Sequence, residues 1–142
     1  MGKRKPASIE NCSFLELPKI HNRAGNITVL ENNTSLPFEV KRVFYLYDIP
    51  GGEARGGHAH KELFQFIVAA SGSFNVLLDD GTDKKDFFLN HPTQGLLVVP
   101  GIWAEIRGFS SGAICLVLAS MAYSEEDYIR DYSEFINYIH EI

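Results

Sequence analysis

Residues 50–61 of the chain read Pro-Gly-Gly-Glu-Ala-Arg-Gly-Gly-His-Ala-His-Lys, and this stretch is the most informative part of the sequence. Its glycines allow the backbone to turn sharply and to approach a ligand closely. His58 and His60 are two positions apart, so on a strand both imidazoles point to the same face. Arg55 precedes the pair and Lys61 follows it, which adds positive charge. This pattern predicts a functional site rather than a surface turn with structural histidines.

The sequence on both sides of this stretch consists of short apolar segments separated by turn residues. The segments that resemble strands are 14–20, 27–31, 39–48, 62–70, 74–78, 84–89, 96–99, 102–107 and 113–120. Turn signals lie between them, including Asp-Asp-Gly-Thr at 79–82, which is typical of a hairpin. Turns that recur about every 8–12 residues are typical of a sandwich or barrel. The chain has 142 residues, which fits one domain over 1–142.

The composition changes after Ser120, where a helical pattern begins. Ser124 is a suitable N-cap and is followed by three acidic residues that favour a helix start. Apolar residues then recur at helical spacing, namely Tyr128, Ile129, Tyr132, Phe135, Ile136 and Ile139. We therefore expect a C-terminal helix, in one or two pieces.

Charge and hydropathy exclude several classes of protein. The net charge of -5 argues against a nucleic-acid partner, whose binding surface would be basic. No apolar run approaches the roughly 20 residues of a membrane helix, and the basic N-terminus lacks the apolar stretch of a signal peptide. Cys12 and Cys115 are far apart in the sequence and form no CxxC motif, and Cys115 lies in an apolar segment typical of a core strand, which suits a buried thiol in a reducing cytoplasm. We expect a cytoplasmic protein that is not bound to a membrane.

Two interpretations of the histidine pair compete. Paired imidazoles suit zinc, iron, copper or nickel, and the stretch resembles the first cupin motif, in which His-x-His and a following Glu supply three ligands. In this chain Phe64 or Gln65 stands at the Glu position, and Ala104 stands where the second cupin motif supplies a His. Because two of four ligands are replaced, the pair favours acid–base chemistry without a metal.

In the acid–base interpretation, one imidazole acts as a base while the other donates a proton or a hydrogen bond. Histidine suits both roles because it titrates near neutral pH. Arg55 and Lys61 favour the neutral imidazole that a base requires, and they can hold an anionic substrate.

Segments from about Phe14 to Phe135 resemble the sugar 3,4-ketoisomerases that act on dTDP-4-keto-6-deoxyglucose. The most similar segments are Lys-Arg-Val-Phe-Tyr at 41–45, residues 55–61, Pro-Gly-Ile-Trp-Ala-Glu at 100–105, Val-Leu-Ala-Ser at 117–120 and Asp-Tyr-Ile-Arg-Asp-Tyr at 127–132. The resemblance implies an all-β cupin fold, a double-stranded β-helix or jelly-roll barrel, with a short C-terminal helix and no metal or other cofactor. It also implies a homodimer, often with exchanged N-terminal strands. The implied product is a dTDP-3-keto-6-deoxyhexose, which an aminotransferase then converts to a 3-amino sugar for polysaccharides or natural products.

The resemblance also implies roles for individual residues. His58 and His60 match the catalytic pair, with His58 the better candidate for the base, and Arg55 matches an arginine associated with the nucleotide phosphates. Trp103 and Glu105 match a Trp-x-Glu in the second motif. We therefore expect catalytic roles for His58 and His60, and substrate-binding roles for Arg55, Lys61, Tyr45, Trp103 and Glu105.

Several positions differ from the family pattern around the sugar pocket. Ala104 stands where many members have His or Arg, and Phe44 and Leu97 stand where many have tyrosine. An N-terminal Arg-Gly is represented here by Arg-Ala-Gly at 23–25. These differences leave open the configuration at C4 of the product and two alternative functions. One is a 3,5-epimerase on a related substrate, and the other is a cupin that binds dTDP-sugars without turnover.

Overall fold

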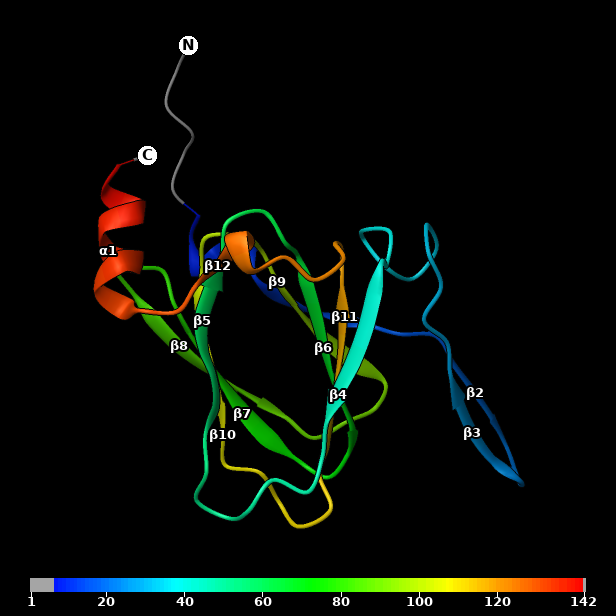
Figure 1. Ribbon diagram of the computed structural model, residues 1–142. Coiled ribbons are helices and arrows are strands. Elements are labelled where there is room, and N and C mark those ends of the chain that lie inside the picture. Colours follow the sequence, from blue (N-terminus) through cyan, green and yellow to red (C-terminus); the bar gives the residue numbers. More distant parts are fainter. Residues whose placement is uncertain (1–6, 142) are drawn as a thin grey trace.

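The computed structural model describes residues 7–141, which form two antiparallel five-stranded sheets and one separate hairpin (Figure 1). The strands are β1 (Ser13–Glu16), β2 (Lys19–Asn22), β3 (Gly25–Thr28), β4 (Arg42–Leu46), β5 (Arg55–His60), β6 (Gln65–Ser71), β7 (Phe74–Asp79), β8 (Lys84–Leu89), β9 (Gln94–Val98), β10 (Trp103–Arg107), β11 (Ile114–Ala119) and β12 (Tyr128–Ile129). The helices are the 3₁₀ turns η1 (Ile9–Asn11) and η2 (Glu125–Asp127) and the α-helix α1 (Tyr132–His140).

The chain alternates between the two sheets as it proceeds. The first sheet has the order β1-β9-β6-β11-β4, and the second has the order β12-β5-β10-β7-β8. From β4 to β12 the chain changes sheet at every step except the β7–β8 hairpin. This confirms the predicted all-β jelly-roll barrel with a short C-terminal helix.

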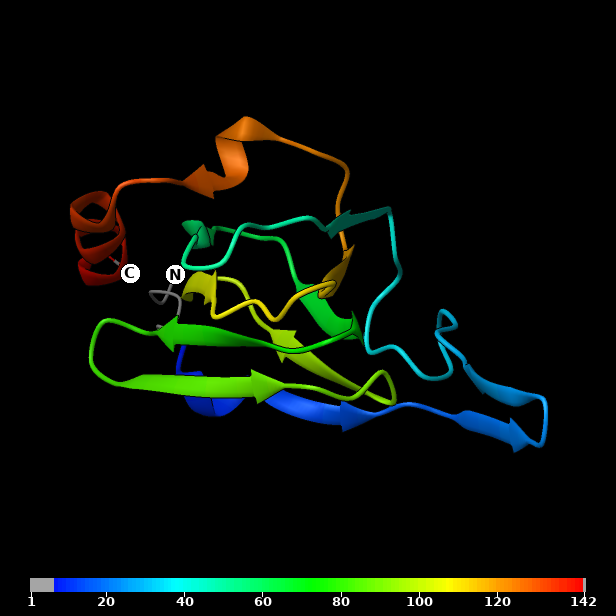
Figure 2. The same cartoon turned by 90° about the horizontal axis from the view of Figure 1, so that it is seen from below.

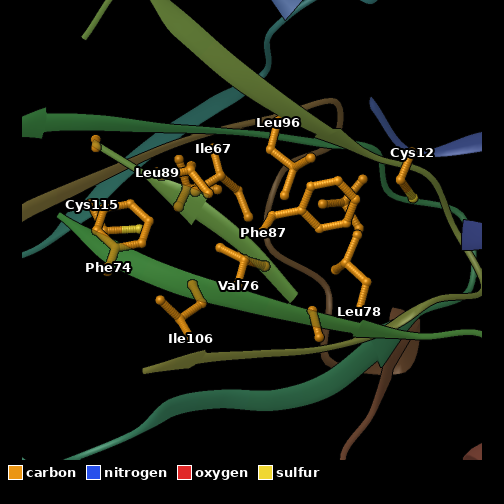
Figure 3. Packing of buried hydrophobic residues seen from close by; sticks show 14 of the residues in the cluster. Cys12, Ile67, Phe74, Val76, Leu78, Phe87, Leu89, Leu96, Ile106 and Cys115 are labelled. Atoms are coloured by element: carbon orange, nitrogen blue, oxygen red, sulfur yellow. The ribbon is translucent and has the colours of Figure 1, made fainter. Parts of the chain in front are cut away.

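The main core lies between the two sheets, where most inward-facing side chains are apolar (Figure 3). Ile67 of β6 and Leu96 of β9 come from the first sheet, and Val76 and Leu78 of β7 come from the second. All four are fully buried or nearly so. Strand alternation explains this arrangement, because every second side chain of a strand points to the same face.

A second apolar layer covers the outer face of the second sheet. Ala59 of β5 and Trp103 of β10 point outward and pack with Phe135 and Ile139 of α1. Gly81, in the β7–β8 turn, has a φ of +90° and no room for a side chain, because a Cβ would lie 2.0 Å from Ile139 Cδ1. The helix therefore docks directly on the sheet.

The C-terminal segment differs from the sequence-based expectation. Tyr128 and Ile129 were expected in a helix, but they form β12 and pair with His60 and Ala59 of β5. The helix proper starts at Tyr132, where the Asp131 side chain accepts hydrogen bonds from two backbone N–H groups of the first turn. Sheet pairing therefore outweighs the helical periodicity of this segment. Within residues 7–141, no helix is long and apolar enough to cross a bilayer.

The N-terminus also differs from expectation, and the histidines lie on a strand that is absent from the apolar segments identified in the sequence. His58 and His60 belong to β5. The single expected strand at 14–20 is divided at 17–18 into β1, which joins the first sheet, and β2. Strands β2 and β3 form a hairpin that projects away from the barrel (Figures 1 and 2). Its paired residues Ile20 and Ile27 are 53% and 58% exposed.

Candidate active site

Strand β5 places both histidines on the inner face of the second sheet. His58 lies opposite Ala104 of β10, and His60 lies opposite Tyr128 of β12. The two imidazole rings meet edge to face with their centroids 4.9 Å apart. His58 and His60, which the sequence predicted to act together, are therefore in contact in the folded protein. Both rings line one cavity, whose other lining residues are Leu63, Gln65, Val98, Val99, Ile102 and Ala104.

His60 is anchored by Asp127, the last residue of η2. His60 Nδ1 lies 2.9 Å from Asp127 Oδ2, and both residues are buried. The other carboxylate oxygen accepts a hydrogen bond from the backbone N–H of Glu62 at 2.7 Å. The second ring nitrogen, His60 Nε2, is buried and has no hydrogen-bond partner within residues 7–141. One edge of the ring is thus held by the protein, and the other can bind a ligand.

Tyr128 links the histidines to the first sheet. Its ring centroid lies 5.1 Å from that of His58 and 4.4 Å from that of His60. Its hydroxyl oxygen accepts a hydrogen bond from Arg42 Nη2 at 3.3 Å. Because Arg42 belongs to β4 and Tyr128 to β12, this contact joins the edge strands of the two sheets next to the histidine pair.

A second arginine, Arg130, contacts the face of the same tyrosine ring. The Arg130 guanidinium lies 4.1 Å from the centroid of the Tyr128 ring. Glu125 holds Arg130 in a bidentate contact, with Nε 2.6 Å from Oε1 and Nη2 2.9 Å from Oε2. The Tyr123 hydroxyl also donates to Glu125. Two cations, Arg42 and Arg130, therefore flank the aromatic side of the site.

Burial and these cations keep both imidazoles neutral near pH 7. Burial lowers the pKa of His58 to about 4, and positive charge on His60, Arg130 and Arg42 acts in the same direction. Burial also lowers the pKa of His60, although the hydrogen bond and the charge of Asp127 oppose the shift. Neutral imidazole is the form that can accept a proton, so both rings are available as bases.

Arg55 is exposed at the start of β5, where the strand pairing is irregular. The register with β10 shifts between the pair His58–Ala104 and the pair Arg55–Ile106. Arg55 therefore lies on the same strand as the histidines, and its expected role in contacting the substrate stays a prediction.

Trp103 and Glu105 lie on the opposite face from the histidines. The Trp103 ring packs against Tyr132 and Phe135 of α1, with centroid distances of 5.4 and 5.8 Å. Trp103 Nε1 donates to Glu105 Oε1 at 3.3 Å. Because β10 alternates, Ala104 between them is the residue that lines the histidine cavity. Trp103 therefore packs under α1, and neither Trp103 nor Glu105 faces the histidine cavity. The substrate-binding roles expected for both residues stay predictions.

Tyr45 and Lys61 are likewise not placed at the histidine cavity. Tyr45 is 58% exposed on β4 and lies beside Tyr47, with a ring separation of 5.6 Å. The neighbouring Phe44 is half-buried, packs against the main core and lies beneath the Arg42 guanidinium. Lys61 lines two surface hollows beside η2 and α1 and does not line the histidine cavity.

Sequence reasoning assigned no role to four residues that the fold brings to the histidines, which are Arg42, Asp127, Tyr128 and Arg130. All four lie within segments that carry the family resemblance, which was the available signal. Asp127 contacts His60 of β5 although the two residues are 67 positions apart in the sequence. Arg42 and Tyr128 are in contact across 86 positions. Separations of this kind are decided by sheet pairing and not by local pattern.

The described part of the chain contains no group of three or more His, Cys, Asp or Glu side chains arranged to hold a metal ion. Around the pair, the residues that complete the cavity wall are apolar or amide side chains and Ala104. These are not ligands that zinc or iron prefers. The expectation of a metal-free site stays a prediction that elemental analysis can test.

Comparison with known proteins places the chain in a family. The FdtA family model, described as WxcM-like, C-terminal, matches residues 10–140. A TDP-4-oxo-6-deoxy-alpha-D-glucose-3,4-oxoisomerase from Aneurinibacillus thermoaerophilus is 44% identical over 128 residues, which is 90% of this chain and 92% of that protein.

Solved structures agree with this result. A 3,4-ketoisomerase from Helicobacter canadensis is 42% identical with a TM-score of 0.89, covering 92% of this chain and 98% of its own. The sugar 3,4-ketoisomerase QdtA from Thermoanaerobacterium thermosaccharolyticum, solved in complex with TDP, is 34% identical with a TM-score of 0.91, covering 94% and 98%. With matching sequence and fold over nearly its whole length, the chain belongs to the FdtA family of sugar 3,4-ketoisomerases.

Proposed function

We propose that this enzyme converts dTDP-4-keto-6-deoxyglucose to a dTDP-3-keto-6-deoxyhexose. The observation that carries the proposal is the pair of neutral imidazoles, His58 and His60, that face one cavity. The names of the relatives support the substrate, since one acts on TDP-4-oxo-6-deoxyglucose and another was solved with TDP.

The reaction needs a base at C3 of the sugar. The C4 carbonyl acidifies the C3–H bond, and His58 takes this proton while the bonding electrons form C3=C4 and the C4 oxygen becomes an enolate. His58 then returns a proton to C4, which leaves the carbonyl at C3. The lowered pKa of His58 keeps it neutral and ready to accept.

The two oxygens must also exchange a proton during the reaction. The C3 hydroxyl loses its proton as the C3 carbonyl forms, and the C4 oxygen gains one. His60 lies with its ring centroid 4.9 Å from that of His58, so it can serve these oxygens while His58 serves the carbons. It can also stabilise the enediolate by a hydrogen bond.

Cations beside the histidines can hold the nucleotide diphosphate. Arg42 Nε is buried and lacks a hydrogen-bond partner within residues 7–141, so it can donate to a phosphate oxygen. Arg130 is the second such cation, and its Glu125 partner is exposed and can be replaced by phosphate. Arg55, exposed at the start of the strand that carries both histidines, is the third candidate.

The decisive test is incubation of the purified enzyme with dTDP-4-keto-6-deoxyglucose, followed by NMR in D₂O. We expect a 3-keto product that carries deuterium at C4 if the proton held on His58 exchanges with solvent, whereas partial retention of protium at C4 would show that an imidazole carries the same proton from C3 to C4. Deuterium at C5 instead would identify an epimerase. Tight binding of the nucleotide sugar without turnover, with an aminotransferase present to trap any product, would favour the sugar-binding alternative.

We also propose that the enzyme is a homodimer in which the N-terminal strands contact or replace those of the partner. The exposed Ile20–Ile27 pair on the projecting hairpin supports this, because an exposed apolar pair is stabilised when a partner covers it. Strand β1 lies at the edge of its sheet, where exchange between copies is simplest. Light scattering at micromolar concentration should give twice the mass of one chain, and a monomer with an intact hairpin would refute the proposal.

A cytoplasmic location completes the proposal. Cys12 and Cys115 are both buried free thiols, which is usual for proteins of a reducing compartment.

A further inference from the structure

Asp127 is a buried residue whose two carboxylate oxygens and backbone carbonyl contact the end of β5 and the two residues after it. Its Oδ2 lies 2.9 Å from His60 Nδ1, and its Oδ1 accepts from the backbone N–H of Glu62 at 2.7 Å. Its backbone carbonyl accepts from the N–H of Lys61 at 2.9 Å, and its own N–H donates to Ser124 O at 3.1 Å. The carboxylate is therefore fixed from several directions, as a group that positions another side chain must be.

This contact determines which nitrogen of His60 carries the proton. An ionised carboxylate only accepts hydrogen bonds, so His60 Nδ1 must donate. In a neutral imidazole the other nitrogen, Nε2, then has a lone pair and no hydrogen. Nε2 is also the nitrogen that has no partner within the described residues.

The other histidine of the pair lacks such an anchor. The His58 side chain makes ring contacts with His60 and Tyr128 but no hydrogen bond to any described residue. The two imidazoles therefore differ, because the tautomer of His60 is set before the substrate arrives and that of His58 is not.

We propose that Asp127 is a positioning residue that holds His60 as the Nδ1–H tautomer, so that its Nε2 takes the proton of the C3 hydroxyl and delivers it to the C4 oxygen. The proton balance is complete: His58 moves one proton from C3 to C4, and His60 moves one from O3 to O4. The imidazolium formed transiently on His60 is stabilised by the adjacent carboxylate. The chemistry rests on the proposed function, but the tautomer does not.

The first test measures the tautomer in the substrate-free protein. Long-range ¹H–¹⁵N correlation spectra distinguish a protonated Nδ1 from a protonated Nε2. We expect His60 to show a protonated Nδ1 and a bare Nε2. A protonated Nε2 in the wild type would overturn the proposal even if the enzyme is active. Absence of isomerase activity together with the expected tautomer would instead count against the proposed function alone.

The second test is Asp127→Asn, with Glu126→Gln as the matched control. Glu126 is the exposed neighbour in the same 3₁₀ turn, so its variant should keep wild-type kinetics. An amide can present its NH₂ to His60 Nδ1, which favours the opposite tautomer, so Asp127→Asn should lower kcat about 10²-fold with little change in KM. In a His60→Asn background the same change should cost at most about twofold, because the group it positions is gone. An equal loss in both backgrounds would show a merely structural role.

A histidine titration separates positioning from packing. Loss of the carboxylate should lower the pKa of His60 further, since Asp127 opposes the effect of burial. The charged or titratable groups that face His60 are His58 on β5, Arg42 on β4, Asp127 on η2, Tyr128 on β12 and, just after it, Arg130. All of these groups except Asp127 are unchanged in the Asp127→Asn variant. A shift in the pKa of His60 therefore reports the loss of its contact with the Asp127 carboxylate. An unchanged pKa of His60 in a folded Asp127→Asn protein would contradict the proposal.

Discussion

The two faces of the β5–β10 pair are built from alternating residues of the same short segments, yet they differ in chemistry. The inner face presents His58 and His60 to a cavity beside two arginines. The outer face presents Ala59 and Trp103 to the apolar side of α1. Residues that are neighbours in the motif thus belong to different environments, and closeness in sequence is a poor guide to membership of the site.

The largest effect is expected from a substitution on the inner face, as a loss of catalytic rate. His58→Asn removes the proposed base and keeps a similar size, so kcat should fall by about 10²-fold or more, with binding of the nucleotide sugar largely kept. His91→Asn, at an exposed histidine outside the site, should keep full activity. Steady-state kinetics and a binding titration check both variants. Near-wild-type turnover by His58→Asn would make His60 the leading candidate for the carbon base.

The second-largest effect is expected from a substitution on the outer face, as a loss of stability rather than of catalysis. Trp103→Ala leaves a cavity beneath α1, next to Tyr132 and Phe135, and should lower the free energy of unfolding by about 3–5 kcal/mol. Trp103→Phe should lose clearly less. Denaturant unfolding gives the stability, and assays well below the melting temperature should show an unchanged KM. A raised KM with normal stability would restore the substrate-binding role expected from the sequence.

The pH dependence of kcat/KM and of stability should distinguish the buried histidines from solvent-exposed ones. Because the pKa of His58 is lowered to about 4 and that of His60 is also lowered, kcat/KM should stay high well below pH 6.5. The unfolded chain binds protons at its histidines from about pH 6.5 downward, whereas folded His58 resists protonation until about pH 4. The contribution of His58 to the free energy of unfolding should therefore be fully present above pH 6.5 and should be lost as the pH falls from about 6.5 to about 4. An acid limb of kcat/KM at pH 6.5 or above would show that the pKa of at least one of the two rings is not lowered as described.

The smallest effect is expected at Glu105. Its hydrogen bond from Trp103 is long, at 3.3 Å, and the residue is only half-buried. Glu105→Gln keeps an acceptor for the indole N–H, so stability should change by about 1 kcal/mol at most and KM should not change. Thermal unfolding and steady-state kinetics are sufficient to check this. A KM raised several-fold would place Glu105 at the substrate after all.

Local pattern was sufficient to predict an all-β sandwich or barrel and the histidine pair, whereas the choice of a jelly-roll barrel came from the family resemblance. Alternating apolar residues between turn signals predicted most strands of the two sheets, and the spacing of His58 and His60 placed both on one face of a strand. The failure at 128–129 has a physical cause. The apolar spacing there fits a helix, but the backbone of Tyr128 and Ile129 gains hydrogen bonds by pairing with β5.

The sequence alone determined the chemistry, namely which residue types could exchange protons and that the usual cupin metal ligands are replaced at Phe64, Gln65 and Ala104. Only the tertiary structure decided which partners surround the pair. It brought Asp127 to His60 and Arg42 to Tyr128, and it turned Trp103 away from them. The reason is that strand alternation is a local property, whereas the pairing of distant strands depends on how the whole barrel buries its apolar surface.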